Sequence, residues 1–387
     1  MENSELYDLF LTLIRQEMRV NSNDCIKDIT ISEQQAKELI KFSRKHSLDH
    51  LIISALLKNG LLNKQSDFAK KAEQSLFRTV ITDERKNYDI INISKLFEKN
   101  NIDFILLKGS VMRNYYPERW MRSSCDIDVL VRDIGSAERI LAENGYIKLQ
   151  EGSHDVLFIS TAKIGVELHF RLIETDDRVS AVLSRVWDTA TPEADTKHSY
   201  LMSNEMFRFY HIAHMSKHFL FGGCGIRFFI DLWLLMQNQE INSREYEQML
   251  AEAGLLAFAQ HCESLARIWM AGEEPQGALA EMAEFILNGG VFGATNNAVL
   301  IYRTKYSNKV TFILYRIFMP YRLMRLKYPI LEKTPVLLPF YWVRRWFEFL
   351  FAKKKRENAK NETRLSGYAD GESIYRMKNL LSFLELK

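Results

Sequence analysis

The hydrophobic rhythm of the chain changes abruptly near residue 98, and this change constrains the fold more than any other feature. Up to about residue 97, apolar residues recur at helical spacing, as in Leu6, Phe10 and Leu13. The run Ile102–Leu107 is instead short, continuous and apolar, which predicts a strand. The sequence therefore places a sheet inside a largely helical chain.

A block of short strands and helices follows this change. Asp126–Val131 reads DIDVLV, in which polar and apolar residues alternate with the period of a half-buried strand. The predicted order is a strand over Ile102–Leu107, a helix over Val111–Tyr116, the strand Asp126–Val131, a helix over Ala137–Asn144, and strands near Tyr146–Leu149, Val156–Ser160 and Val166–Phe170. The block spans roughly 98–175 and predicts a small α/β unit.

Helical periodicity returns after residue 200, with helices predicted over Asn204–Phe221, Ile226–Gln239, Ser243–Ala271 and Glu372–Leu386. Gly and Pro together number 24 of 387 residues, roughly half the usual share, so long helices should dominate. We therefore expect an α+β, mainly helical fold in four parts. These are an N-terminal helical region over 1–97, the α/β core over 98–175, a helical domain over 200–300 that closes a cleft, and a basic aromatic C-terminal helical region over 301–387.

Composition narrows the class of protein. Charged residues make up 26% and apolar residues 47% of the chain, which excludes a disordered, collagenous or disulfide-rich miniature protein. The four cysteines lie far apart with no CxxC pair, so we expect neither a zinc site nor a disulfide framework. The first twenty residues carry acids where a signal peptide needs positive charge, and no uncharged apolar run reaches about 18 residues. We therefore expect a cytoplasmic protein.

The C-terminal part is strongly basic. Between Arg303 and Lys360 there are 15 Lys and Arg residues against three acids, and 14 aromatic residues lie between Tyr302 and Phe351. Such a segment suits the surface of an anionic membrane, which would place the protein peripherally at the inner face of the membrane. Base stacking on single-stranded nucleic acid is a second interpretation. A basic face packed on the acidic body of the same chain is the structural alternative, and all three stay open here.

The residues with the clearest chemical potential lie in the α/β block. Asp126 and Asp128 are two residues apart on a predicted strand, so their side chains leave the same face. Two adjacent carboxylates repel each other unless a cation lies between them, and Mg²⁺ is held by such oxygen ligands together with phosphates. Solvated acids at a strand end are the alternative. Gly109-Ser110 falls at a strand-to-helix turn, where backbone N–H groups can bind a phosphate.

A third acid occurs on a later predicted strand. Glu167, in GVELHF, alternates onto one face with His169. A carboxylate at this position would complete a two-metal site for in-line displacement at phosphorus. An exposed strand glutamate without a role is the simpler alternative.

These motifs resemble the polymerase-beta-like nucleotidyltransferase superfamily. The longer pattern LLKGSVMRNYYPERWMRSSCDIDVLV, followed by VELHF, is similar to a bacterial family of uncharacterised nucleotidyltransferases found among gene clusters for cell-envelope polysaccharides and peptide products. The resemblance covers about 95–235 and extends loosely to about 345. It implies a polymerase-beta-like core, divalent metal (Mg²⁺ or Mn²⁺) at Asp126, Asp128 and Glu167, and contact of Gly109 and Ser110 with a nucleoside triphosphate.

The connection between the two motifs departs from the superfamily pattern. Fifteen residues separate Ser110 from Asp126, so this loop must carry an insertion. Its basic residues are natural phosphate partners, and Lys108 adds a further charge beside the glycine. We accordingly expect nucleotide contacts from Lys108, Arg113 and Arg122, with Arg119 as a further candidate in the loop.

A histidine-rich helix face is the second candidate feature. His211, His214 and His218 share one face of a predicted helix, with Lys217 beside them. Without a carboxylate at a ligand position, a zinc site is not expected, and we assign His169, His214, Lys217 and His218 to the acceptor side of the cleft. Arg227 and Asp231 are four residues apart and should form an ion pair within a helix.

The expected activity is metal-dependent transfer of a nucleotidyl group from an NTP, ATP being the expected one, with release of pyrophosphate. The acceptor is a hydroxyl or phosphate that the sequence does not identify. Nucleic acid is not the expected acceptor because no nucleic-acid-binding module is apparent. The alternative function is a non-catalytic binding or antitoxin-like protein that keeps the same fold.

Overall fold

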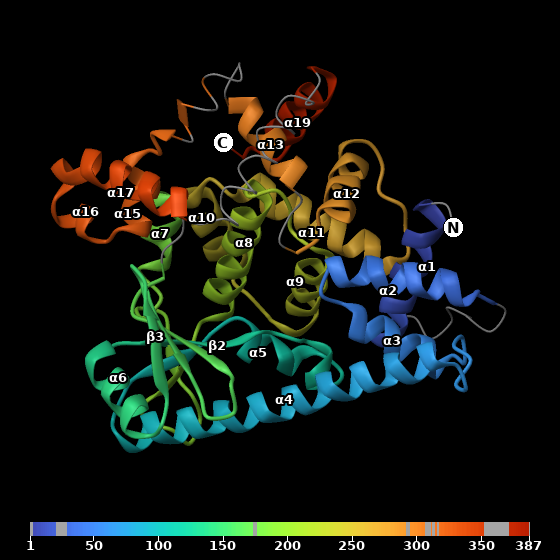
Figure 1. The fold of residues 1–387 in the computed structure, drawn as a ribbon, viewed down its shortest axis with the longest axis horizontal. Coiled ribbons are helices and arrows are strands. Elements are labelled where there is room, and N and C mark those ends of the chain that lie inside the picture. Colours follow the sequence, from blue (N-terminus) through green and yellow to red (C-terminus); the bar gives the residue numbers. More distant parts are fainter. Residues whose placement is uncertain are drawn as a thin grey trace.

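The computed structural model describes residues 3–20, 29–172, 176–291, 295–305, 311, 314–315, 317–351 and 371–386. Within these residues the chain is mostly helical and contains one mixed sheet of seven strands (Figure 1). This confirms the predicted α+β, mainly helical class.

Four helices precede the sheet: α1 (Asn3–Glu17), α2 (Glu33–Lys45), α3 (Asp49–Lys58) and α4 (Asp67–Lys99). Ser32 caps α2 and exchanges hydrogen bonds with Gln35, which is the reciprocal arrangement of a capping box. The helix α4 is 33 residues long and passes beneath the sheet in Figure 1. Its C-terminal half packs with α6 in the core under the sheet.

The sheet has the strand order β3-β4-β5-β2-β1-β7-β6. Its strands are β1 (Phe104–Leu106), β2 (Asp126–Val131), β3 (Ile147–Glu151), β4 (Asp155–Ile159), β5 (Gly165–His169), β6 (Thr191–Pro192) and β7 (Ser199–Leu201). The five predicted strands are present. The sheet also takes β6 and β7 from beyond residue 175, and β7 pairs in parallel with β1. Two- and three-residue strands are too short to show a periodic pattern in the sequence.

Short helices connect the strands. α5 (Gly109–Met112) continues into the 3₁₀ helices η1 (Arg113–Tyr115) and η2 (Arg119–Met121), and α6 (Ile134–Glu143) crosses from β2 towards β3. α7 (Asp177–Leu183) follows β5. The predicted helix over Val111–Tyr116 is therefore one short turn of α-helix followed by 3₁₀ turns.

The two faces of the sheet differ in polarity. Ile127, Val129 and Val131 of β2 are fully buried in a core with α4 and α6, as the alternation predicts. The opposite face carries Asp126 and Asp128 and lies towards the helices α8 (Asn204–Leu220) and α9 (Ile226–Asn238). The two aspartates predicted as site residues thus lie on the face that α8 and α9 cover.

The remaining helices form a second, larger core. They are α10 (Ser243–Ala253), α11 (Leu256–Ala271), α12 (Ala278–Gly289), α13 (Thr295–Lys305) and α19 (Gly371–Phe383). Together with α8, α9 and the N-terminal helices α1–α3 they bury one continuous apolar cluster. The single helix predicted over Ser243–Ala271 is wrong, because Gly254 adopts a left-handed conformation (φ +67°) that ends α10 before α11 begins.

The basic C-terminal segment forms a small unit of its own at the edge of the molecule (Figure 1). Its elements are α15 (Tyr321–Lys327), α16 (Ile330–Lys333), η3 (Pro335–Leu337) and α17 (Leu338–Phe351), which enclose Met324, Tyr328 and Leu331. Arg322 and Arg325 pair with Asp176 and Asp177 of the main body. The Lys-rich run from Lys353 lies outside the described residues. Among those described, no helix has the length and apolar character to cross a bilayer.

The backbone just before α9 is closely packed at Gly225. A Cβ on Gly225 would lie 2.6–2.8 Å from Val291, including its backbone N and Cα. We predict that Gly225→Ala lowers the free energy of unfolding by about 1–3 kcal/mol, because backbone at this contact must move. Gly135→Ala, where the nearest atom is 3.6 Å away, should leave stability unchanged or raise it by up to about 1 kcal/mol. Urea denaturation followed by circular dichroism measures both, and equal effects would contradict the prediction.

Candidate active site

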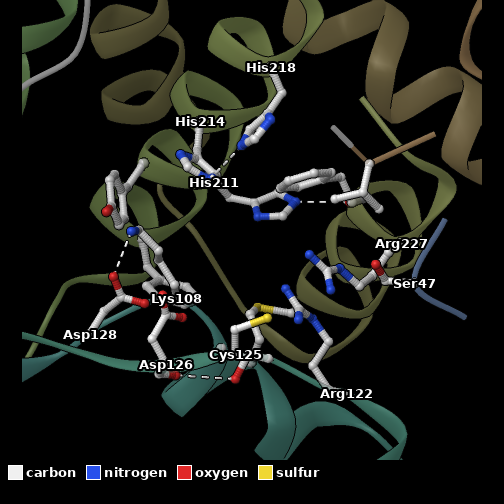
Figure 2. A pocket seen from close by; sticks show the side chains of 17 residues that line it. Ser47, Lys108, Arg122, Cys125, Asp126, Asp128, His211, His214, His218 and Arg227 are labelled. Atoms are coloured by element: carbon white, nitrogen blue, oxygen red, sulfur yellow. Dashed lines mark hydrogen bonds and ion pairs between the residues drawn. The ribbon is translucent and has the colours of Figure 1, made fainter. Parts of the chain in front are cut away.

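A cavity of about 290 Å³ lies between the polar face of the sheet and the helices α8 and α9. Figure 2 shows acids and Lys108 on one side, arginines on another, and three histidines above them. The cavity is lined by Ser47, Lys108, Gly109, Met112, Arg122, Ser124, Cys125, Asp126, Asp128, Phe207, Tyr210, His211, His214, His218, Arg227, Phe228 and Val291. It therefore collects side chains from segments about 240 residues apart.

The register of two parallel strands brings the acids together. β2 pairs with β5 so that Asp128 lies opposite Glu167 and Leu130 opposite His169. His169 Nε2 is 3.0 Å from Asp128 Oδ1 and 3.6 Å from Glu167 Oε2. One potential ligand atom of each of these three residues lies within 4.8 Å of the other two. This group of two carboxylates and an imidazole has donors that suit a divalent cation.

Asp126 lines the cavity but is not a member of this compact group. Partial burial, followed by the charges of Asp128 and Glu167, raises the pKa of Asp126 to about 6. The pKa of Asp128 moves the other way: burial alone would raise it, but Lys108 and His169 hold it well below its usual range. The two aspartates therefore differ in acidity, and Asp128 is the stronger acid.

Lys108 is the cation closest to these acids. Its Nζ donates to Asp128 Oδ1 at 2.7 Å, and its backbone has a positive φ of 44°, unusual for a residue with a side chain. Burial would lower the pKa of Lys108, but Tyr210 and Asp128 keep it well above its ordinary value. Lys108 thus contacts a carboxylate here, where the sequence suggested a phosphate contact.

The Gly109-Ser110 turn is only partly directed into the cavity. Gly109 lines it, and a Cβ at this position would lie 2.8 Å from Ser124 Cβ and Oγ, so the close approach needs glycine. Ser110 is buried and does not line the cavity, and its N–H donates to the Leu107 carbonyl at 3.1 Å. Ser124 lines the cavity instead, with its Oγ 2.8 Å from Lys86 Nζ.

Arg122 is buried beside the cavity in a strong ion pair. Its guanidinium donates to both carboxylate oxygens of Asp231 at 2.7 Å, and the Tyr116 hydroxyl donates to the same carboxylate. Burial alone would raise the pKa of Asp231, but Arg122 lowers it. The predicted ion pair between Arg227 and Asp231 within α9 is wrong, because Arg122 occupies this carboxylate.

Arg227 is consequently a cation without an acidic partner among the described residues. Its Nη1 donates to the Ser123 carbonyl at 3.3 Å, while its buried Nε has no hydrogen-bond acceptor there. Burial, and then the nearby Arg122, lower the pKa of Arg227 to about 10. A half-buried arginine that lines a cavity without an acidic partner among the described residues has guanidinium N–H groups available to an anion. Sequence reasoning missed this residue, because its i, i+4 spacing to Asp231 indicated an ordinary ion pair.

Three histidines of α8 form one wall of the cavity. His211 Nε2 lies 2.9 Å from the Phe228 carbonyl, and burial lowers the pKa of His211 to about 4. His214 and His218 both line the cavity, with their Nε2 atoms 3.1 Å apart. His211, His214 and Phe228 thus offer aromatic surface with a few polar atoms.

Five predicted site residues do not line this cavity: Ser110, Arg113, Glu167, His169 and Lys217. Arg113 is buried and pairs with Asp83 of α4, away from the cavity. Lys217 lines a different cavity near Asp176. His169 belongs to the group with Asp128 and Glu167, where the sequence had assigned it to the acceptor side.

The comparisons with known proteins agree with this chemistry. A sequence model of a family described as uncharacterised nucleotidyltransferase matches residues 32–271, which is more than half of the chain. Searches of curated proteins and of solved structures gave no significant match. The chain therefore belongs to this nucleotidyltransferase family. The matched region runs from the cap of α2 to the end of α11, so it contains the predicted 95–235 but not the looser extension to 345.

The raised pKa of Asp126 gives a test of the site in the metal-free protein. The carboxyl holds its proton more tightly in the folded than in the unfolded chain, so unfolding free energy should fall as pH rises from about 4 to 6. Asp126→Asn removes the free-energy cost of ionising this carboxyl in the folded protein. The variant should therefore be more stable than the parent at pH 7.5 by about 1–3 kcal/mol. Urea titrations in EDTA across this pH range check it. A difference between the two proteins that is independent of pH would refute it.

Proposed function

We propose that the protein is a metal-dependent nucleotidyltransferase that moves an NMP group from an NTP, ATP being the expected one, to a hydroxyl or phosphate of an acceptor, with release of pyrophosphate. Membership of the family supports nucleotidyl transfer in general. The observation that carries the proposal is that one cavity is lined by Asp126, Asp128 and Arg227, a cation that lacks an acidic partner among the described residues. Glu167 does not line the cavity but lies opposite Asp128 on the neighbouring strand. An NTP with a divalent cation has charges complementary to the acids and to Arg227.

Three acidic residues are placed to bind the cation. Asp128 and Glu167 face each other across β2 and β5, and Asp126 lies in the same cavity. A bound Mg²⁺ or Mn²⁺ supplies charge neutralisation for the triphosphate and lowers the pKa of an attacking hydroxyl. Carboxylate oxygens are suitable ligands for either ion. With a pKa of about 6, Asp126 is ionised at neutral pH and is the candidate to accept the proton of the acceptor.

Basic groups opposite the acids are placed to bind the phosphates. Arg227 offers guanidinium N–H groups that no carboxylate occupies, and Gly109 permits close approach of backbone. Arg122 is already neutralised by Asp231, so its contribution is to hold the cavity wall. Lys108 keeps Asp128 ionised in the absence of substrate. His214 and His218 line the part of the cavity that remains for the acceptor.

Binding of nucleotide tests this function directly. We predict that the protein binds ATP only with Mg²⁺ or Mn²⁺ and that Asp128→Asn abolishes binding, because the cation then loses a buried ligand. Arg227→Met should weaken binding about 10- to 100-fold, the contribution expected of hydrogen bonds to a charged group. Isothermal titration calorimetry measures both, and a screen of the four NTPs for pyrophosphate release over a panel of acceptors measures transfer.

Arg267→Met is the matched control, because Arg267 lies on α11 outside the cavity and its guanidinium is largely exposed. It should bind ATP like the parent. Equal ATP affinity with and without metal would exclude the proposed chemistry. Metal-dependent ATP binding without pyrophosphate release for any NTP or acceptor would favour the non-catalytic binding protein.

We further propose that the C-terminal unit attaches reversibly to anionic lipid. Of the 17 large apolar side chains that are exposed in the described residues, nine lie between Leu314 and Phe347, so the apolar surface is concentrated there. Phe340, Val343 and Phe347 follow one face of α17. Lys333 and Arg344 of the same unit are exposed, and Arg344 pairs with Glu348. Apolar and basic side chains together suit an anionic bilayer surface better than a neutral protein surface.

Flotation with phosphatidylglycerol vesicles tests the attachment. The parent protein should float at low salt and lose this binding at high salt, because screening shortens the reach of each basic charge. Phe340→Ser with Phe347→Ser should remain at the bottom of the gradient even at low salt. Phe77→Ser, an exposed phenylalanine on α4, should float like the parent. If the parent is absent from the vesicle fraction at low salt, the proposed attachment to lipid is wrong. The apolar face would then bind another partner, such as a second copy of the chain.

A further inference from the structure

The third member of the acidic group is an imidazole. His169 lies two residues after Glu167 on β5, is only 4% exposed, and points from the same face of the sheet. Its ring stacks against His154, with the ring centres 6.0 Å apart and the planes inclined by 28°. A buried side chain held in this way directs one nitrogen, Nε2, at the two carboxylates.

The two separations from His169 Nε2 are close to those between neighbouring ligands of a single ion. Two ligands that each lie roughly 2.1 Å from an ion and at right angles are about 3.0 Å apart. The observed distances from His169 Nε2 are 3.0 Å to Asp128 Oδ1 and 3.6 Å to Glu167 Oε2. His169 therefore stands where a neighbouring ligand would stand.

The hydrogen bonds of the group leave room for ligation. Asp128 Oδ1 accepts from both Lys108 and His169, while Asp128 Oδ2 accepts no hydrogen bond from a described residue. His169 Nδ1 is buried and likewise has no partner among the described residues, so no hydrogen bond there fixes the tautomer of the ring. Ligation through Nε2 requires the proton of the neutral ring to move to Nδ1, so that the ion replaces the Nε2 hydrogen bond to Asp128.

We propose that His169 Nε2 binds the catalytic ion together with Asp128 and Glu167, and that this donor set selects Mn²⁺ over Mg²⁺. The inference rests on the proposed function and deepens it. Mg²⁺ is a hard ion that prefers oxygen ligands and several waters, whereas imidazole nitrogen is a good ligand for first-row transition ions. Replacing one carboxylate of an all-oxygen site by imidazole therefore favours Mn²⁺.

The experiment uses Mn²⁺ alone with the full-length protein. Loss of the electron paramagnetic resonance signal of aqueous Mn²⁺ measures binding, and electron spin echo modulation detects a ¹⁴N nucleus coordinated to bound Mn²⁺. We expect ¹⁴N modulation from the parent, and we expect Mg²⁺ to displace half of the Mn²⁺ only at tenfold or greater excess. Bound Mn²⁺ without ¹⁴N modulation, or displacement by equal Mg²⁺, would overturn the inference.

Two variants identify the nitrogen. His169→Asn should remove the modulation and reduce the excess of Mg²⁺ needed for displacement, while Mn²⁺ still binds through Asp128 and Glu167. His154→Asn, the matched control at the stacked ring, should keep the modulation. If His169→Asn keeps it, another histidine is the ligand and the inference fails. The measurement on the parent decides the presence of a nitrogen ligand even if a variant does not fold.

The result also separates this inference from the proposed function. Tight Mn²⁺ binding without a nitrogen ligand, together with metal-dependent ATP binding, would remove His169 from the ion and leave the nucleotidyltransferase intact. Absence of both Mn²⁺ and Mg²⁺ binding, with and without ATP, would overturn the two together.

Discussion

The parallel pairing of β2 with β5 is the constraint on which the candidate site depends. It sets Asp128 opposite Glu167 and Leu130 opposite His169, so that acids and imidazole share one face of the sheet. The residues between them, Val129 and Leu168, are fully buried in the opposite core. If the pairing of β2 with β5 shifted by one residue, the acids would point into that apolar core. Burial of the apolar residues on the α4 side therefore fixes the register that brings the acids together on the other side.

Charge balance is the second feature that shapes the cavity. Asp231 is fully buried, and two arginines, Arg122 and Arg227, lie near it. Of these two arginines only Arg122 donates hydrogen bonds to it, beside the one from the Tyr116 hydroxyl. The ion pair between Arg122 and Asp231 also connects the loop before β2 to α9, and this connection fixes the two sides of the cavity relative to each other. Arg227 is left with positive charge and a low-dielectric surrounding. A folded protein tolerates such an imbalance where a ligand later supplies the opposite charge.

Much of the fold could be predicted from the sequence because its signals are local. The strand Asp126–Val131 and the helices beginning at Asn204 and Ile226 appear at the expected positions. Errors arose where one residue overrides a periodic pattern, as Gly254 does between α10 and α11. The strands β6 and β7 were not predicted, because they gain their pairing from β1 and not from a pattern of their own.

The sequence by itself determined that Asp126 and Asp128 leave one face of a strand, because alternation in a strand is a local property of the backbone. It also indicated Glu167 and the histidine-rich face of α8 as companions. Only the tertiary structure decided that Ser110 and Arg113 turn away from the cavity, that His169 joins the acids, and that Arg122 takes Asp231 from Arg227. Arg122 and Asp231 are 109 residues apart, and a contact of that kind depends on how helices pack over a sheet, for which the sequence has no periodic signal.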